Sequence, residues 1–412
     1  MDRQMRHDKD EVRPARAHAL LFATILAFAS LAFAYTSSGA QLAGAKDLPT
    51  ADLAIVNARI YPAPDAVPID HGTVLIHAGK VTAVSGSSVR IPVGADTIDA
   101  GGAVVTAGFW NSHVHILTPT LLHAQDHSAE DISRELQALF TRWGFTTVFD
   151  LASLLQNTNT LRERIRTGEV TGPRILTVGD PFFPAGGTPI YVRQFLQDNG
   201  FPSEEVALPA TAAARARRQL EAGADGVKIF AGAIVGGDIG VLPMPLDIAR
   251  AAVQEAHRAG KPAFAHPSDA RGIEVSIESG VDVLTHTAPE MGPWNAELVA
   301  RLRAHRMALV PTLTLFKVEM EKKRASAEEI EKTLGVAAQQ VKIFSRSGGQ
   351  ILFGTDLGYI DVDDTTDEYR LMSRSLDWRQ ILASLTTSPA QRFDGGGKSG
   401  RLTVGAVADL VV

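Results

Sequence analysis

Residues 262–286 read PAFAHPSDARGIEVSIESGVDVLTH and hold a short apolar run, a helical pattern and a second apolar run. The two apolar runs, residues 262–265 and 281–284, have the length of strands, and the helical pattern covers residues 271–279. Strands that are apolar throughout and alternate with helices are typical of a parallel sheet covered on both faces. A histidine lies at or just beyond the end of each apolar run.

The same alternation extends over most of the chain. Counting a first run at Val104–Val105 that extends to Ile116, eight apolar runs occur over about 290 residues, with helical patterns between them. This number of units fits an α/β fold of the (β/α)8 TIM-barrel type, whose usual size is about 250 residues. An open, doubly wound sheet is the alternative, but no glycine fingerprint for a dinucleotide follows the first strand. The remaining apolar runs are residues 146–149, 175–178, 226–230, 308–310 and 351–353, and the remaining helical patterns are residues 128–143, 212–221, 246–259, 295–305 and 327–346.

A different pattern precedes the barrel. Residues 52–99 contain at least three short strand-like runs separated by turn residues, which predicts a small antiparallel sheet. Such a sheet is too thin to be stable alone, so we expect another segment of the chain to complete it.

The N-terminal segment predicts export. Residues 1–16 are slightly basic, and residues 17–34 form an uncharged apolar run that closes with Ala32-Phe33-Ala34, the pattern of a secretory signal peptide. The run of about 18 residues also just spans a bilayer, so an uncleaved membrane anchor is one alternative and a buried soluble helix is the other. We expect residues 1–34 to be a signal peptide or membrane anchor, residues 35–51 to be a linker, and the protein to be exported (periplasmic or secreted) or membrane-anchored.

Composition excludes several classes of protein. Of the 412 residues, 45% are hydrophobic and 21% are charged, as in ordinary globular proteins, so the chain is neither disordered nor fibrous. The formal net charge is −6 and no long basic run occurs, which argues against a nucleic-acid partner. Because the chain has no cysteine, disulfides, thiolate metal sites and cysteine nucleophiles are excluded. Any metal ion must be held by His, Asp, Glu or a modified Lys.

Ionisable residues stand at the ends of five of the predicted strands. In a barrel, the carboxyl ends of all strands meet at one face, where the catalytic loops begin. The two histidines of the H-x-H after the first strand share one side of the chain, because side chains alternate along a strand. Any one of these residues is more often a hydrogen-bonded core residue, but together they predict a metal site. They are His113 and His115 on strand 1, Lys228 on strand 4, His266 on strand 5, His286 on strand 6 and Asp356 on strand 8.

The order H-x-H, K, H, H, D resembles the amidohydrolase superfamily of metal-dependent hydrolases, in the branch related to imidazolonepropionase and Xaa-Pro dipeptidases. The likeness covers residues from about 52 to 412 and includes IDAGG at residues 98–102, GFWNSHVH at residues 108–115 and GRLTVGAVADLVV at residues 400–412. It implies a small β-sandwich-like domain from residues 52–103, completed by about 400–412, and a barrel over residues 104–399. In the family further strands usually follow the closing motif, so the stop at Val412 implies either a fragment or an incomplete small domain.

The resemblance also implies a role for each ligand. His113, His115 and Asp356 would hold the more buried of two divalent metal ions, expected to be zinc, and His266 and His286 the more exposed one. Lys228 would bridge the two ions as a carbamate, since an ordinary lysine with a pKa near 10.4 is a cation and cannot be a ligand. Asp356 would act as general base toward a metal-bridging hydroxide and would then protonate the leaving amine.

These roles predict a dinuclear hydrolase that cleaves an amide C–N bond in a small-molecule or peptide substrate, such as a dipeptide, an N-acyl amino acid or a cyclic amide. The alternatives are a mononuclear deaminase or cyclic-amidase-type hydrolase, against which Lys228 argues, and a non-catalytic exported binding protein, for which a ligand should be missing. Tyr191 and Arg193, in the long stretch after strand 3, are candidates for substrate contacts. Association into an oligomer stays open.

Overall fold

The computed structural model describes residues 50–86, 89–395 and 399–412. The predicted signal peptide or anchor at residues 1–34 and nearly all of the predicted linker at residues 35–51 lie outside the described residues. No helix in the described part of the chain is both long enough and apolar enough to cross a membrane.

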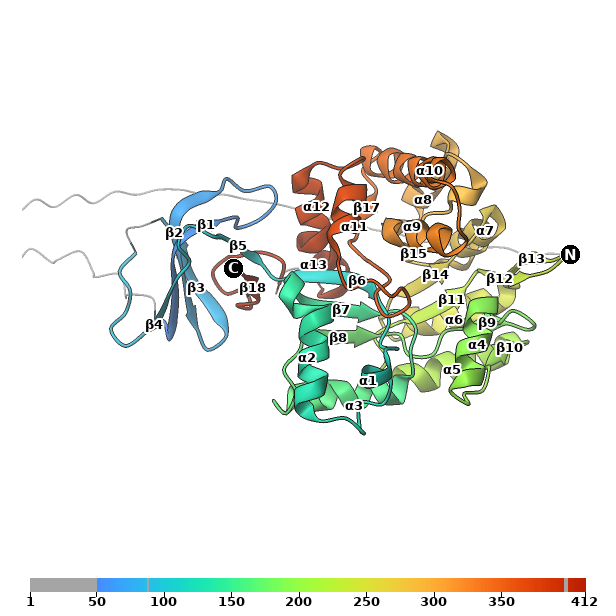
Figure 1. Cartoon of the computed structure of the whole chain (residues 1–412), viewed down its shortest axis with the longest axis horizontal. Coiled ribbons are helices and arrows are strands. Elements are labelled where there is room, and N and C mark those ends of the chain that lie inside the picture. Colours follow the sequence, from blue (N-terminus) through green and yellow to red (C-terminus); the bar gives the residue numbers. More distant parts are fainter. Residues whose placement is uncertain (1–49, 87–88, 396–398) are drawn as a thin grey trace, which may run out of the picture. The chain divides into compact units, whose positions relative to one another are not determined.

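Two parallel sheets lie at the centre of the larger part of the described chain (Figure 1). The first has the order β6-β7-β8 and the second the order β11-β14-β15-β16-β17, so the strands follow one another in sequence order within each sheet. The strands are β6 (Phe109–Val114), β7 (Phe145–Asp150), β8 (Arg174–Thr177), β11 (Val227–Phe230), β14 (Ala263–His266), β15 (Val283–Thr285), β16 (Ala308–Val310) and β17 (Gln350–Ile351).

Backbone hydrogen bonds connect the segments that follow the edge strands β8 and β17 to strands of the other sheet. At one edge, the amide of Phe182 donates to the carbonyl of Lys228 at 2.8 Å, and the amide of Phe230 donates to the carbonyl of Phe182 at 2.9 Å. At the other edge, the amide of Ser112 donates to the carbonyl of Phe353 at 2.7 Å. The arrangement is a TIM-barrel-like α/β fold, and the carboxyl ends of the parallel strands lie at one face.

The helices pack their apolar faces against these strands, and Figure 1 shows the strands surrounded by helices. The helical patterns predicted from the sequence all correspond to helices, with ends that shift by at most four residues. These helices are α2 (Ala129–Leu139), α5 (Pro209–Glu221), α6 (Leu246–Arg258), α7 (Ala270–Ser279), α8 (Ala296–Ala304) and α10 (Ala327–Arg346). Further helices are α1 (Pro119–Leu122), α3 (Leu155–Arg166), α9 (Leu313–Lys322), α11 (Thr366–Met372), α12 (Trp378–Leu385) and α13 (Thr387–Phe393).

The first apolar run is two strands rather than one. Val104–Ala107 forms β5, which pairs with the N-terminal strands, and the parallel sheet begins only with β6 at Phe109. Gly108 separates them, and a Cβ at this position would lie 2.1 Å from Oγ1 of Thr146. The chain therefore passes from one sheet to the other where only glycine fits.

The N-terminal strands form one six-stranded sheet that is mixed rather than antiparallel. β1 pairs antiparallel with β2 but parallel with β4 and β5, and β18, close to the end of the sequence, pairs antiparallel with β5. The cluster inside this sheet includes Leu402, so residues after 399 contribute to its core. The strands are β1 (Leu53–Ile60), β2 (Ile69–His77), β3 (Lys80–Ser85), β4 (Asp96–Asp99) and β18 (Leu410–Val411).

The long stretch after β8 contains elements that the periodicity did not indicate. It holds β9 (Phe183–Pro184), the helix α4 (Ile190–Asp198) and β10 (Glu205–Val206). A hairpin formed by β12 (Gly232–Gly236) and β13 (Gly240–Pro243) follows β11. Both additions lie on the loops that follow strands, where barrels build their binding sites.

Candidate active site

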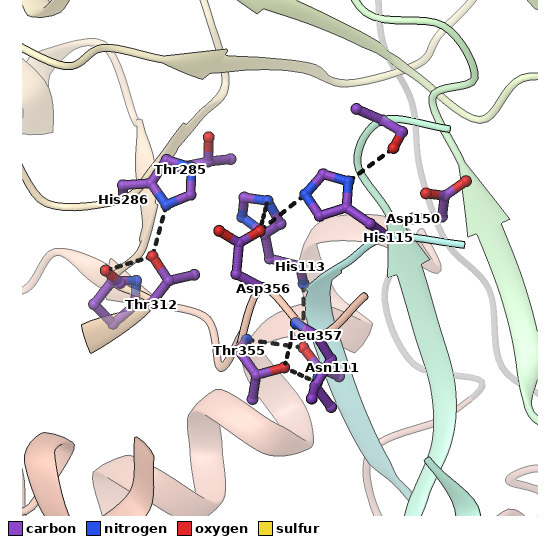
Figure 2. A network of polar contacts seen from close by, with 12 residues as sticks. Asn111, His113, His115, Asp150, Thr285, His286, Thr312, Thr355, Asp356 and Leu357 are labelled. Atoms are coloured by element: carbon purple, nitrogen blue, oxygen red, sulfur yellow. Dashed lines mark hydrogen bonds and ion pairs between the residues drawn. The ribbon is translucent and has the colours of Figure 1, made fainter. Parts of the chain in front are cut away.

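Three of the expected ligands converge at the carboxyl end of β6. Oδ1 of Asp356 lies 3.1 Å from Nε2 of His113 and 2.8 Å from Nε2 of His115. All three side chains are buried, and one potential ligand atom from each lies within 4.8 Å of the others. Figure 2 shows the three side chains directed toward one another. This trio is the candidate metal cluster of the described residues.

The hydrogen bonds of His115 show that the trio fits a metal ion. Nδ1 of His115 lies 2.7 Å from the carbonyl oxygen of Ala152, which can only accept, so Nδ1 carries a proton. In a neutral ring, Nε2 then turns a lone pair toward the carboxylate of Asp356 at 2.8 Å. Such a contact needs a proton or a metal cation between the two groups. In addition, Nδ1 of the buried His113 has no hydrogen-bond partner among the described residues, and its Nε2 approaches Asp356 at 3.1 Å without the geometry of a hydrogen bond. Such unsatisfied nitrogens are unusual in a buried ring unless a ligand completes the site.

His286 is also oriented by a hydrogen bond at its Nδ1. Oγ1 of Thr312 donates its proton to the carbonyl of Pro311 at 2.9 Å. In the contact of 2.6 Å with Nδ1 of His286, this hydroxyl oxygen therefore accepts. Nδ1 of His286 is therefore the protonated nitrogen, and Nε2 remains available as a ligand. Figure 2 shows this contact between His286 and Thr312.

The remaining expected ligands adjoin this group. The ring centroid of His286 lies 4.7 Å from that of His113 and 4.5 Å from that of His266. Lys228 is buried on β11, and its side chain borders the same cavity as His266, His286 and Asp356. All six residues singled out in the sequence thus lie around one site.

Burial sets the protonation state of these side chains. It lowers the pKa of His113 and of His266 to about 3, and it lowers the pKa of His286 well below its ordinary value. Burial alone would raise the pKa of Asp356, but the neighbouring imidazoles of His113 and His115 hold the pKa of that carboxyl well below its usual range. These shifts favour neutral imidazoles at His113, His266 and His286 and an ionised carboxylate at Asp356, the forms that bind metal ions.

The backbone at this site is held in unusual conformations. His286, Thr312 and Asp356 have positive φ angles of 75°, 46° and 65°, in the left-handed region that residues with a Cβ seldom occupy. Next to Asp356, the side chain of Asn111 donates to Oγ1 of Thr355 at 2.7 Å and links β6 to the loop after β17. Strained residues persist only where the surroundings hold them, and they cluster at functional sites.

The site opens into a cavity of about 750 Å³. His115, Lys228, His266, His286 and Asp356 form one part of its lining, and α4 and α9 supply much of the rest. A volume of this order accommodates a small-molecule substrate.

Only one of the two residues expected to contact the substrate lines the cavity. Tyr191 lines the cavity and packs edge-on against Tyr359, with ring centroids 5.3 Å apart. Arg193, two residues further along α4, is exposed, does not line this cavity, and donates from Nε to the carbonyl of Thr188 at 2.9 Å. The structure therefore favours Tyr191 and not Arg193 as a substrate contact.

Sequence reasoning missed several residues that shape the site. Thr312 orients His286, the carbonyl of Ala152 orients His115, and Tyr359 lies with its ring centroid 6.4 Å from that of His115. Thr312 lies two residues after β16 and Tyr359 eight residues after β17, and this position after a strand is the sequence signal that could have drawn attention to them. A backbone carbonyl leaves no signal in the sequence.

The amidohydrolase family model matches residues 104–412, three quarters of the chain. The chain therefore belongs to the amidohydrolase family and is a hydrolase acting on carbon–nitrogen bonds, in a family that depends on metal ions. No curated protein matches the sequence significantly.

Solved structures with the same fold include several hydrolases. A prolidase complexed with N-methylphosphonate-L-proline is 24% identical, with 87% of this chain and 91% of that chain covered and a TM-score of 0.70. A Xaa-Pro dipeptidase with methionine in its active site is 21% identical, with 87% and 92% covered and a TM-score of 0.71. Molinate hydrolase is 21% identical, with 88% and 89% covered and a TM-score of 0.69. At these identities the likeness shows the fold alone.

Proposed function

We propose that the protein is a dinuclear metal-dependent hydrolase that cleaves an amide C–N bond. The observation that carries this proposal is the convergence of His113, His115 and Asp356 beside His286 and His266, at the ends of parallel strands. The likeness to a prolidase and to a Xaa-Pro dipeptidase supports a dipeptide, an N-acyl amino acid or a cyclic amide as the first substrates to try.

The second metal ion depends on Lys228. This side chain is buried on β11 beside the ligands, and burial lowers its pKa to about 7, so that a large fraction is an uncharged amine at neutral pH. An uncharged amine is the form that reacts with carbon dioxide. The resulting carbamate is an anion that can join two cations, whereas an ammonium group would repel them.

The chain's own residues would divide the work of hydrolysis. His113, His115 and Asp356 would hold one ion, and His266 and His286 would hold the other. Carbamylated Lys228 would be a ligand of both ions. The ions, zinc by the affinity of that metal for imidazole, supply a Lewis acid and lower the pKa of water. Asp356 would take a proton on Oδ1 or Oδ2 and then deliver it to the nitrogen of the leaving amine. Tyr191 and Tyr359, which line the cavity near His115, would contact the substrate.

Variants of Lys228 test the proposal. We expect wild-type protein to contain two zinc ions per chain, and Lys228→Ala to lose at least one of them together with most of its turnover of dipeptides or N-acyl amino acids. Carbon-13 NMR under labelled carbon dioxide should detect a carbamate resonance that Lys228→Ala lacks. Lys332→Ala, at an exposed lysine of α10, is the matched control. Two bound metals and near-native turnover in Lys228→Ala would refute the dinuclear mechanism.

The proposal extends to the whole chain. We infer a complete (β/α)8 barrel that begins with β6 and extends to about residue 399, and a small β domain of residues 52–107 that is completed by about residues 400–412. We also infer export directed by residues 1–34. N-terminal sequencing of the protein from its producing cells should begin after Ala34, and an intact Met1 on cytoplasmic protein would refute export.

A further inference from the structure

Aromatic side chains form a continuous wall from the candidate ligands into the cavity. The ring of Phe230 stacks on that of His266 with centroids 4.9 Å apart, and Phe183 packs against Phe230 at 4.8 Å. The four rings Phe183, Phe230, Tyr191 and Tyr359 all border the cavity. One side of the site is therefore apolar up to the atoms that would hold the metal.

This wall is separate from the core that holds the fold together. Phe183 and Phe230 belong to a small cluster with Ala233 and Val235, apart from the larger clusters between the strands and helices. Tyr191 packs against this small cluster from α4. A second aromatic pair, Phe195 and Phe201, borders the cavity further along α4 with centroids 6.2 Å apart. Because these rings border the cavity as well as their own small cluster, they can contact a ligand that enters it.

The charges around the cavity disfavour a substrate carboxylate. Apart from the candidate ligands, four carboxylates line it (Asp180, Glu204, Glu290 and Glu319) and only two basic side chains (Arg215 and Lys323). Lys323 is exposed, just beyond the end of α9.

Arg215 is already engaged within the protein. Its Nη1 donates to the carbonyl of Glu204 at 2.6 Å and its Nη2 to the carbonyl of Pro181 at 3.0 Å. Its Nε lies 3.2 Å from the carboxylate of Glu204, which balances its charge. The buried part of the cavity therefore offers no uncommitted cation, among the described residues outside the ligand set, for a carboxylate on the substrate.

We propose that this site takes amides that carry an aromatic or similarly bulky apolar group and no carboxylate. The inference rests on the proposed amide hydrolysis and selects among its substrates. The cavity should favour neutral amides over free dipeptides and N-acyl amino acids, because those compounds carry a carboxylate for which the cavity supplies no uncommitted basic side chain. The aromatic group would lie against the wall formed by Phe183, Phe230 and the rings of α4.

Two substrates of matched shape and a small dipeptide test the inference with zinc-loaded protein. N-benzylphenylacetamide is neutral, N-phenylacetylphenylglycine is the same skeleton with a carboxylate beside the nitrogen, and glycylproline is a small zwitterionic dipeptide. We expect kcat/KM for the neutral amide to exceed the other two by roughly tenfold or more. A preference for either carboxylate would overturn the inference and leave amide hydrolysis standing. Failure of the metal-loaded protein to hydrolyse any amide would overturn both.

Variants of α4 test where the aromatic group binds. Phe195→Ala should weaken binding of N-benzylphenylacetamide roughly tenfold, because it removes one of the aromatic rings of α4 that border the cavity. The affinity of Phe195→Leu should lie between those of wild type and Phe195→Ala. Isothermal titration calorimetry with metal-depleted protein measures this binding without turnover. Leu208→Ala, at an exposed leucine that does not border the cavity, is the matched control. Equal affinities in Phe195→Ala and wild type, with both proteins folded by circular dichroism, would exclude α4 as the binding wall and overturn the inference.

Discussion

Single hydroxyl and carboxyl groups outside the ligand set control the geometry of the site. Thr312 fixes the tautomer of His286 through a contact of 2.6 Å, and it does so from a left-handed backbone conformation that a β-branched residue rarely adopts. A strained residue of this kind is retained when its side chain is needed at one position.

We expect Thr312→Val to weaken binding of one metal ion by about 10- to 100-fold while the fold is retained. Valine has the same shape and the same backbone preference, so the change removes only the hydroxyl. Metal affinity is measured by competition with a chromogenic chelator. The matched control is Thr365→Val, because the hydroxyl of Thr365 is buried but has no hydrogen-bond partner. Equal metal affinities in the two variants would show that Thr312 does not position His286.

Glu368 gives the stability a pH dependence that can be measured. Its buried carboxylate accepts from the amides of Leu313 and Thr314 at 2.9 and 2.7 Å, at the start of α9, and burial raises its pKa to about 7. The folded protein therefore binds a proton that the unfolded chain, with an ordinary glutamate pKa of 4.5, releases earlier. The contribution of Glu368 to the free energy of unfolding should fall as the pH rises from about 4.5 to about 7.

The comparison with Glu368→Gln isolates this contribution, since glutamine does not titrate. Between pH 5 and pH 8, we expect the free energy of unfolding of the wild type to fall by up to about 3 kcal/mol relative to that of Glu368→Gln. Urea unfolding at fixed metal concentration measures it. A difference that stays constant over this range would mean that the carboxyl titrates near its ordinary value.

At the scale of elements, the loop after β17 has to pass very close to the end of β6. A Cβ at Gly358 would lie 1.9 Å from the carbonyl oxygen of His115, and the φ angle of Gly358 is 89°. Glycine is therefore required here both for space and for conformation. The approach brings Asp356 within reach of His113 and His115.

Two glycine-to-alanine variants should have opposite effects. Gly358→Ala should lower the free energy of unfolding by about 3 kcal/mol or more and reduce metal content, because the loop must move away from His115. Gly335→Ala, inside α10 with nothing within 4 Å of the new Cβ, should raise stability by about 0.5 to 1 kcal/mol. Urea unfolding and elemental analysis measure both. Normal metal content in Gly358→Ala would show that the loop does not need this close approach.

The elements differ in how well the sequence predicts them. Helices such as α10 and strands such as β16 were predicted with their correct bounds, because their apolar faces are buried by the rest of the fold and follow the period of the element. The helix α4 was not predicted, since several of its apolar side chains face the cavity and not a packed core, and none of its residues is fully buried. The split at Gly108 was missed because a single close contact, and no change in periodicity, separates β5 from β6.

The part of the site that could be predicted is the set of candidate ligands, because these residues lie at the ends of strands. Strand order brings residues that are far apart in sequence to one face, so His113 and Asp356 could be linked by architecture alone. The contacts that orient the ligands, from Thr312 and from the carbonyl of Ala152, depend on loop conformations that no periodicity encodes.

At the scale of the whole molecule, the stretch from residue 399 to residue 412 matters for stability and not for the ligands. Leu402 is buried in the cluster of the six-stranded sheet, β18 pairs with β5, and Asp409 accepts from Oγ1 of Thr146 at 2.9 Å. Every expected ligand lies upstream of this stretch.

We expect removal of residues 400–412 to lower the melting temperature by about 5 °C or more, because a buried leucine and a strand are lost together. Zinc content of the truncated protein, measured well below its melting temperature, should match that of the full chain. Leu402→Ala should give a smaller shift in the same direction. An unchanged melting temperature after truncation would show that the sheet does not depend on its last strand.

The pairing of β18 with β5 also sets an order of events during synthesis. Val104–Ala107 leaves the ribosome about 300 residues before Leu410–Val411, which at synthesis rates of about 5 to 20 residues per second is a delay of roughly 15 to 60 s. During that time one edge of β5 lacks its partner and offers free amides and carbonyls to any other extended chain. The sheet thus closes only after the parallel strands have been made, so its edge at β5 stays open until synthesis reaches Leu410–Val411.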